Sequence, residues 1–401
     1  MDTYRSTYGG CLPGGCRMSQ KVAINLLWMV PGVVGGSETY LTRLLRGLNE
    51  RRSNLEYVVF ALPQFAEAHP ELASIFKTEY APLTGQVKSF RVAGENSWLA
   101  YQCRRQKIDL IHHGGGTMPV IRTTRSVLTI HDLQFLYFPE YFTRTKLTFL
   151  RAMVPRSAEH ARLVLVPSEF SRRTVIERLH IDPSLVIVVP HGIAPREITE
   201  LPTDIRERYD IPGPFFLYPA ATYPHKNHLT LLRAFVRHLG AHPESTLVLT
   251  GAKAWQEWIV AKEMAQRITS EIRKLGIETQ VRQLGYVPSS DLEALYREAT
   301  ALTFPSRFEG FGAPALEAMA RGCPVIASNA TALPEVIADM GLLVSPDNAD
   351  EWSDAMSLMV EDEILRKRFV EGGPQRAQLY NWDLSAGILE DAYNHALETT
   401  L

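Results

Sequence analysis

Short apolar runs without polar alternation recur along this chain, and they constrain its fold more than any other feature. In the first half they lie at 22–29, 55–61, 108–112, 126–130, 163–166 and 185–189. Runs of this kind are typical of strands buried on both faces of a parallel sheet. Segments with helical spacing lie between several runs, including 37–48 and 168–179, where Ser168 suits the N-cap. Alternating strands and helices predict an α/β fold with a doubly wound parallel sheet.

The same pattern starts again in the second half of the chain. The runs there lie at 215–218, 246–250, 281–287, 301–304, 324–327 and 342–344. The stretch between the halves is rich in proline and glycine, as linkers are, and 401 residues exceed what one core usually serves. We therefore predict two domains of this kind facing each other across a cleft. Their expected limits are a flexible extension at 1–20, an N-terminal domain at 21–198, a linker at 199–214, a C-terminal domain at 215–382 and a C-terminal helix at 383–401 that would cross back to the N-terminal domain.

The composition limits the partners and the compartment of the protein. A formal net charge of -2 argues against long-range attraction to nucleic acid, so no nucleic-acid partner is expected. The four cysteines are scattered and form no Cys-x-x-Cys pair, which indicates a reducing compartment. No apolar stretch approaches the roughly eighteen residues of a spanning helix. We expect a cytoplasmic protein, either soluble or peripheral at the inner face of the membrane.

The strongest motif is the segment 304–317, FPSRFEGFGAPALE. A predicted strand ends where it starts, a loop with two glycines follows, and Pro314 suits the first position of a helix. Free N–H groups and the positive end of the helix dipole at such a junction hold phosphates. Glu309 and Glu317 would accept hydrogen bonds from sugar hydroxyls. The alternative is that Glu309 is a solvated loop charge and Glu317 an acid near a helix N-terminus.

Three other candidates also follow predicted strands. Lys226 precedes a helical segment and would neutralise a diphosphate, or it is a solvated charge. Gly35 and Gly36 lie in a loop that opens a helix without the Gly-x-Gly-x-x-Gly spacing, so the loop binds a phosphate or substrate, or is a simple tight turn. His131 ends the strand 126–130 and would contact a reacting sugar, or is a core histidine bonded to the backbone.

Residues 135–173 mix aromatic and basic side chains. They would suit a surface for a lipid-linked acceptor or an anionic membrane, or a packed helix pair with a solvated basic face. The sequence has no histidine or cysteine cluster with zinc spacing and no Asp-x-Asp pair. We therefore expect no metal and no other cofactor.

The spacing of Glu309 and Glu317, with Gly-Phe-Gly between them and the segment 318–328 behind, resembles the Glu-x7-Glu signature of glycosyltransferase family 4. The resemblance runs through nearly the whole chain from about residue 22 and includes the Gly35-Gly36 loop. One position departs from it. Many members carry an arginine five residues before the lysine, where this chain has Ala221. Neutralisation of the diphosphate would then depend more heavily on Lys226, or His225 or Arg307 would compensate. The His-Lys-Asn sequence at 225–227 is similar to mannosyltransferases of polysaccharide assembly.

The resemblance implies a GT-B fold and a retaining transfer of a hexose without a metal. The donor would be a nucleotide-diphosphate sugar, expected to be GDP-mannose, and the acceptor a glycan or a lipid-linked saccharide. The implied catalytic residues are His131, Lys226 and Glu309, the implied donor-binding residues are Gly310, Phe311, Gly312 and Glu317, and the implied substrate loop holds Gly35 and Gly36. Two other functions stay open, a sugar-nucleotide epimerase of the same build and an inactive nucleotide-sugar-binding scaffold.

Overall fold

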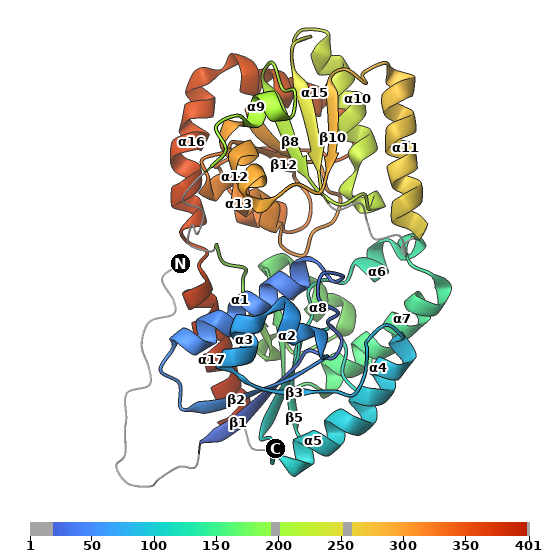
Figure 1. Cartoon of the computed structure of the whole chain (residues 1–401), viewed down its shortest axis with the longest axis vertical. Coiled ribbons are helices and arrows are strands. Elements are labelled where there is room, and N and C mark those ends of the chain that lie inside the picture. The colour runs from blue at the N-terminus through green and yellow to red at the C-terminus, as the bar shows by residue number, and fades with distance from the viewer. Residues whose placement is uncertain (1–18, 194–200, 252–258, 399–401) are drawn as a thin grey trace.

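The structure is a computed structural model that describes residues 19–193, 201–251 and 259–398 of the 401-residue chain. These residues form two α/β domains stacked along the long axis of the molecule, the N-terminal domain below and the C-terminal domain above in Figure 1. Each domain has a parallel sheet at its centre and helices packed around it. The α/β fold class and the two doubly wound sheets predicted from the strand pattern are confirmed.

Among the described residues, the N-terminal sheet has seven strands in the order β3-β2-β1-β4-β5-β6-β7. They are β1 (Gln20–Asn25), β2 (Leu55–Ala61), β3 (Lys77–Tyr80), β4 (Leu110–His113), β5 (Arg125–Thr129), β6 (Leu163–Val166) and β7 (Val186–Val188). The helices and turns are α1 (Gly36–Glu50), α2 (Gln64–Ala68), α3 (Pro70–Ile75), α4 (Lys88–Gly94), η1 (Glu95–Leu99), α5 (Ala100–Arg105), α6 (Gln134–Tyr137), η2 (Pro139–Tyr141), α7 (Arg144–His160), α8 (Glu169–Leu179) and η3 (Pro183–Leu185). The strand order reverses between β1 and β4, where open sheets of this kind bind ligands beyond the strands' carboxyl ends.

The C-terminal sheet has six strands within the described residues, in the order β10-β9-β8-β11-β12-β13. They are β8 (Phe215–Pro219), β9 (Thr246–Thr250), β10 (Val281–Gly285), β11 (Ala301–Phe304), β12 (Val325–Ser328) and β13 (Leu342–Val344). The helices and turns are α9 (Ile205–Arg208), η4 (Pro224–Lys226), α10 (His228–Leu239), α11 (Ile259–Leu275), α12 (Ser289–Glu298), α13 (Ala313–Ala320), α14 (Leu333–Ile337), α15 (Ala349–Glu361), α16 (Glu363–Ala377) and α17 (Trp382–Glu398). The order reverses between β8 and β11, so the loops that follow these two strands lie side by side.

Strand β3 is absent from the sequence prediction. It pairs with β2 at the edge of the sheet, and its sequence is Lys-Thr-Glu-Tyr. Lys77 and Tyr80 are exposed, because an edge strand needs no apolar side chains on both faces. A pattern search for buried strands therefore passes over it.

The predicted linker at 199–214 is in part a piece of the C-terminal domain. Ile205 and Ile211 are almost fully buried, and both belong to the C-terminal hydrophobic core. The proline and glycine around these two isoleucines obscured them in the sequence. Residues 194–200 lie outside the described part of the chain, as do residues 1–18 of the predicted extension.

Helix α17 returns to the N-terminal domain, where it packs against α1. Leu389 and Tyr393 of this helix belong to the N-terminal core. The helices approach closely at Gly47 of α1, where a Cβ would come within 2.8 Å of the Ala386 Cβ. The hydroxyl of Tyr393 lies 2.7 Å from Nδ1 of the buried His112, which ties α17 to β4. The core of the N-terminal domain is therefore completed by the last helix of the chain.

Candidate active site

The segment 304–317 forms the strand, loop and helix predicted for it. Strand β11 ends at Phe304, and α13 begins at Ala313 with Pro314 in its first turn. Gly312 precedes the helix with a φ of 102°, a left-handed conformation that favours glycine. No side chain among the described residues caps this helix, so its first N–H groups stay available to an anion.

Lys226 and Glu309 form an ion pair at the carboxyl edge of the C-terminal sheet. Nζ of Lys226 lies 2.6 Å from Oε1 of Glu309, and the two side chains are 16% and 13% exposed. The loops that carry them follow β8 and β11, the neighbouring strands at the reversal point of the sheet. The structure therefore joins the two residues that the sequence placed 83 positions apart.

Asn227 fixes the Lys226 loop on the Glu309 loop. It adopts a left-handed conformation with a φ of 60° before α10. Its Nδ2 donates to the carbonyl oxygens of Pro305 at 3.1 Å and Pro346 at 2.6 Å. Its Oδ1 accepts a hydrogen bond from the Thr230 hydroxyl at 2.8 Å. Asparagine suits this position because it tolerates the left-handed region and offers both a donor and an acceptor.

Asp132 of the N-terminal domain lies near enough to the ion pair to feel its charges. The residue is exposed, yet the surrounding protein partly desolvates its carboxyl and so raises the pKa of this group. The neighbouring Glu309 carboxylate raises this pKa further, while Lys226 and Lys146 act in the opposite direction. Asp132 was absent from the predicted site residues, although it directly follows His131 at the end of β5.

His131 lies against the backbone of its own domain. Its Nε2 is 3.0 Å from the Gly114 carbonyl oxygen, and the ring of Tyr40 meets the His131 ring edge-on at 5.4 Å. Burial lowers the pKa of His131 to about 4, so the imidazole is neutral at pH 7. A neutral ring beside a carbonyl carries its proton on Nε2. This geometry matches the core histidine bonded to the backbone, and a contact of the ring with a sugar stays a prediction.

Glu317 lies one turn into α13. The Tyr296 hydroxyl is 3.4 Å from Oε2 of Glu317, a long hydrogen bond that leaves the carboxylate able to accept others. Burial raises the pKa of Glu317, and the nearby Arg321 and Arg43 oppose the rise. Because Arg43 lies on α1, the N-terminal domain also approaches Glu317.

Neither residue expected to compensate for Ala221 provides an uncommitted charge. Burial, reinforced by the charge of Lys226, holds the pKa of His225 well below its ordinary value, so its imidazole is neutral. The Arg307 guanidinium pairs with Asp347, with Nη2 at 2.6 Å and Nε at 2.8 Å from Oδ1. In this structure the cation paired with Glu309 is Lys226.

Gly35 and Gly36 form the turn that opens α1. Gly35 has a φ of 71°, which explains a glycine at this position. A Cβ on either glycine would meet no atom within 4 Å, so packing does not require Gly36. Oε2 of Glu38 accepts a hydrogen bond from the Gly32 N–H at 2.7 Å and shapes the loop. The turn is observed, and substrate binding by this loop stays a prediction.

The aromatic side chains of 135–173 are used largely for packing. Phe135 is buried in the N-terminal domain. The rings of Tyr137, Phe138 and Phe170 surround Phe308 of the C-terminal domain, at centroid distances of 5.2, 6.1 and 5.8 Å. These side chains therefore pack inside the N-terminal domain and at its contact with the C-terminal domain. None of the helices in the described ranges is both long and apolar enough to cross a bilayer.

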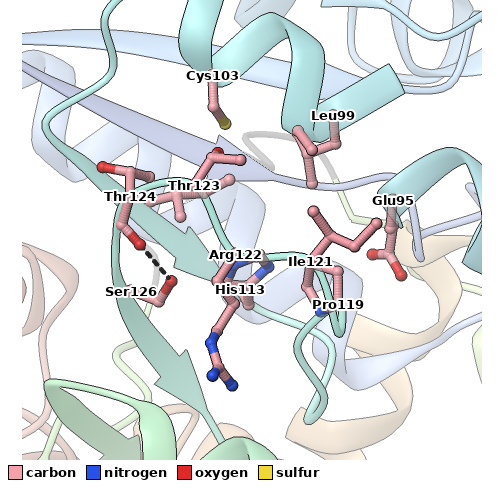
Figure 2. A pocket seen from close by; sticks show the side chains of 12 residues that line it. Glu95, Leu99, Cys103, His113, Pro119, Ile121, Arg122, Thr123, Thr124 and Ser126 are labelled. Atoms are coloured by element: carbon pink, nitrogen blue, oxygen red, sulfur yellow. Dashed lines mark hydrogen bonds between the residues drawn. The ribbon is translucent and has the colours of Figure 1, made fainter. Parts of the chain in front are cut away.

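A small hollow lies in the N-terminal domain beside α5 and η1 (Figure 2). Its volume of about 10 Å³ has room for about one water molecule. Glu95 and His113 line it, and Asn25 Nδ2 lies 2.8 Å from Glu95 Oε1 and 3.1 Å from His113 Nδ1. Burial raises the pKa of Glu95 to about 7 and lowers that of His113 to about 3. A sugar does not fit in this volume. Asn25, Glu95 and His113 therefore form a structural hydrogen-bond network beside the hollow.

Comparison with solved structures identifies the architecture as the GT-B fold of glycosyltransferases. Sucrose-phosphate synthase from Thermosynechococcus elongatus aligns with a TM-score of 0.75 at 21% identity, over 94% of this chain and 98% of that one. Anabaena Alr3699/HepE in complex with UDP and glucose aligns with a TM-score of 0.74 at 19% identity, over 94% and 100%. At these identities the likeness shows the fold alone.

Sequence comparison identifies the family. Residues 34–197 match the model described as Glycosyltransferase Family 4, and residues 203–376 match Glycosyl transferases group 1. The chain is 30% identical over 280 residues to O-antigen chain mannosyltransferase B of Escherichia coli, covering 69% of this chain and 71% of the relative. It is 37% identical over 126 residues to the D-inositol 3-phosphate glycosyltransferase of Corynebacterium glutamicum (strain R), covering 31% and 30%. The chain belongs to glycosyltransferase family 4.

Proposed function

We propose that this glycosyltransferase transfers mannose from GDP-mannose, with retention of configuration and without a metal, to a glycan or lipid-linked saccharide. The observation that carries the proposal is the Lys226–Glu309 pair beside the uncapped start of α13. A cation and free N–H groups together suit a diphosphate. A carboxylate at the same place suits the hydroxyls of the transferred sugar.

The chemistry requires charge stabilisation at two positions. As the nucleoside diphosphate leaves, negative charge grows on its phosphate and positive charge on the anomeric carbon. Lys226 and the N–H groups at the start of α13 stabilise the phosphate as fixed electrostatics. To do so, the Lys226 ammonium exchanges part of its contact with Glu309 for the diphosphate. Glu309 then holds a sugar hydroxyl.

Retention of configuration follows from attack on the face from which the phosphate departs. The leaving phosphate accepts the proton of the acceptor hydroxyl, and this transfer needs no protein base. The neutral His131 ring, whose Nε2 is occupied by the Gly114 carbonyl, agrees with this assignment. Asp132 borders the same space from the N-terminal side and would orient the acceptor.

The donor is inferred from the relative and from the motif. The E. coli relative is named a mannosyltransferase, and the chain matches it over more than two thirds of its length. The carboxylate of Glu317, with one long hydrogen bond to Tyr296, is free to accept from a ribose hydroxyl. GDP-mannose supplies both the mannose and the ribose hydroxyls that these two observations favour.

A donor panel followed by product analysis tests the proposal. Thermal unfolding is measured with GDP, UDP, ADP and their sugars, since a ligand at a hundred times its Kd adds about 2.7 kcal/mol of stability. We expect the largest shift with GDP or GDP-mannose. Transfer to a mannose-containing acceptor in excess EDTA, followed by NMR of the new linkage, is expected to give the α-anomer. A β-anomer, a donor other than GDP-mannose, or an epimerised sugar formed without acceptor would contradict the proposal.

The lipid-linked form of the acceptor would bring the protein to a membrane. Arg144, Phe149 and Arg151 of α7 are exposed and would meet anionic headgroups. Co-sedimentation with vesicles containing anionic lipid is expected to fall for Arg144→Glu/Arg151→Glu relative to the wild type. Equal sedimentation of the two proteins would mean either that the acceptor is a soluble glycan or that another surface of the protein contacts the membrane.

A further inference from the structure

The first turn of α8, in the N-terminal domain, bonds directly to the donor loop of the C-terminal domain. The Ser168 hydroxyl donates to the Gly310 carbonyl at 2.7 Å, and the Ser171 hydroxyl donates to the same oxygen at 3.1 Å. Ser168 Oγ also accepts from the Ser171 N–H at 3.0 Å, which makes it the N-cap of α8 predicted from the sequence. Both serines are buried. One carbonyl of the donor loop is thus held by two hydroxyls of the other domain.

A carboxylate of the C-terminal domain also bonds to the start of α8. Glu335, on α14, accepts from the Glu169 N–H at 2.9 Å through Oε1 and from the Phe170 N–H at 3.1 Å through Oε2. These are N–H groups of a first helical turn, which have no partner within the helix. The positive end of the helix dipole favours a carboxylate there. The start of α8 is therefore fully bonded only while the two domains are in contact.

The backbone of Glu335 is itself anchored near the chain's crossing between domains. The Arg376 guanidinium donates to the Glu335 carbonyl at 2.6 Å, and the Tyr380 hydroxyl donates to it at 3.3 Å. The Tyr380 carbonyl accepts from the Ile193 N–H at 2.9 Å, where the two crossing segments meet. The Glu335 carboxylate is therefore presented from a fixed position.

The contact determines the orientation of one peptide in the donor loop. A trans peptide is planar, so its C=O and the following N–H point in opposite directions. Holding the Gly310 carbonyl on α8 consequently aims the Phe311 N–H away from α8. The packing is tight, since a Cβ on Gly310 would lie 2.3 Å from the His131 carbonyl oxygen. Glycine permits this approach.

We propose that Ser168, Ser171 and Glu335 form an interdomain latch that positions the Gly310–Phe311 peptide for catalysis. The latch holds the domains together at the donor loop and turns the Phe311 N–H toward the leaving diphosphate. This role rests on the proposed function, in which that N–H stabilises the phosphate. The three are positioning residues, because they act through the peptide and not on the substrate.

Steady-state kinetics test the positioning role from both domains. Loss of a hydrogen bond to a charged group corresponds to roughly tenfold or more in an equilibrium, and loss of two neutral hydrogen bonds to one carbonyl reaches a similar factor. We expect Glu335→Gln and Ser168→Ala/Ser171→Ala each to lower kcat about tenfold or more. The donor Kd is expected to change less than threefold, because the C-terminal domain still binds the nucleotide. Glu169→Gln is the matched control, since its side chain is 57% exposed and its ion pair is with Arg172 of the same helix.

A distance measurement in the free protein tests the latch without relying on transfer. Spin labels at the exposed positions Arg151 and Lys262, in protein with Cys11 and Cys16 replaced by serine, report the separation of α7 and α11. We expect both latch variants to shift the distance distribution to longer values and Glu169→Gln to leave it unchanged. Circular dichroism and nucleotide affinity confirm that each variant is folded.

The outcomes separate the latch from the proposed function. Wild-type distances or wild-type kcat in the two latch variants would overturn the latch, as would an equal loss in the control. A donor Kd weakened in proportion to kcat would mean that the residues only support the nucleotide site, and would also overturn it. If the wild type transfers no sugar, the proposed function fails, while the distance measurement still decides whether the latch exists.

Discussion

Replacing Lys226 by methionine separates the two tasks that the structure gives this side chain. Lys226 neutralises Glu309 in the free protein, at 2.6 Å, and in the proposed reaction it stabilises the departing diphosphate. Removing the ammonium leaves a carboxylate that is 13% exposed, with the Asp132 carboxyl nearby. Breaking a buried pair on one side costs about 3–5 kcal/mol, and the partial exposure here lowers the expected loss to about 2–3 kcal/mol.

The catalytic effect is expected to be larger than the effect on donor binding. Removing one preorganised group that stabilises transition-state charge typically lowers turnover on the order of a hundredfold. Since the interaction strengthens as the leaving group gains charge, kcat is expected to fall more than the donor KM rises. Steady-state kinetics and urea unfolding of Lys226→Met measure the two effects independently.

The double variant Lys226→Met/Glu309→Gln is the decisive control. Without the Glu309 charge no carboxylate is stranded, so the double variant is expected to be more stable than Lys226→Met. If Lys226 also holds the diphosphate, turnover of the double variant stays about a hundredfold below that of Glu309→Gln. Equal turnover of these two proteins would refute the diphosphate assignment, because Lys226 would then serve only to neutralise Glu309.

Four further outcomes follow from the structure. Gly310→Ala places a Cβ 2.3 Å from the His131 carbonyl oxygen, so kcat is expected to fall at least tenfold, and unchanged kinetics would contradict the close approach. Glu317→Ala is expected to weaken donor binding by about 1.5–3 kcal/mol in calorimetry, the worth of hydrogen bonds to a charged group. Transfer is expected to persist in excess EDTA; loss of activity that magnesium or manganese restores would overturn the metal-independent mechanism. The pKa of Glu95 rises from 4.5 to about 7 on folding, so its contribution to stability is full below pH 4.5 and is lost as the pH rises to 7. Glu95→Gln is therefore expected to be more stable than the wild type at pH 8, by up to about 3 kcal/mol, and not at pH 4, and equal thermal stability at pH 8 would contradict the burial of this charge.

Local patterns in the sequence were sufficient for most of the fold and for the donor loop. Buried parallel strands are recognisable because both faces must be apolar, and every predicted strand is present. Ser168 was recognisable as an N-cap because a short polar side chain before a helix satisfies a free N–H. The loop with Glu309 was recognisable because its glycines and Pro314 specify a strand, a turn and a helix in order.

Tertiary structure decided which of these pieces meet. The reversal of strand order between β8 and β11 brings Lys226 to Glu309, and no local pattern encodes that distance. Asp132 and Glu335 join the site from segments in which no local pattern assigns either carboxylate a contact. Their partners lie in the opposite domain, across 166 residues in the case of Glu335 and Glu169. Backbone sterics and side-chain periodicity act over a few residues, so they can be recognised along the chain. A hydrogen bond between domains exists only after both cores have packed and set the two backbones at a fixed separation.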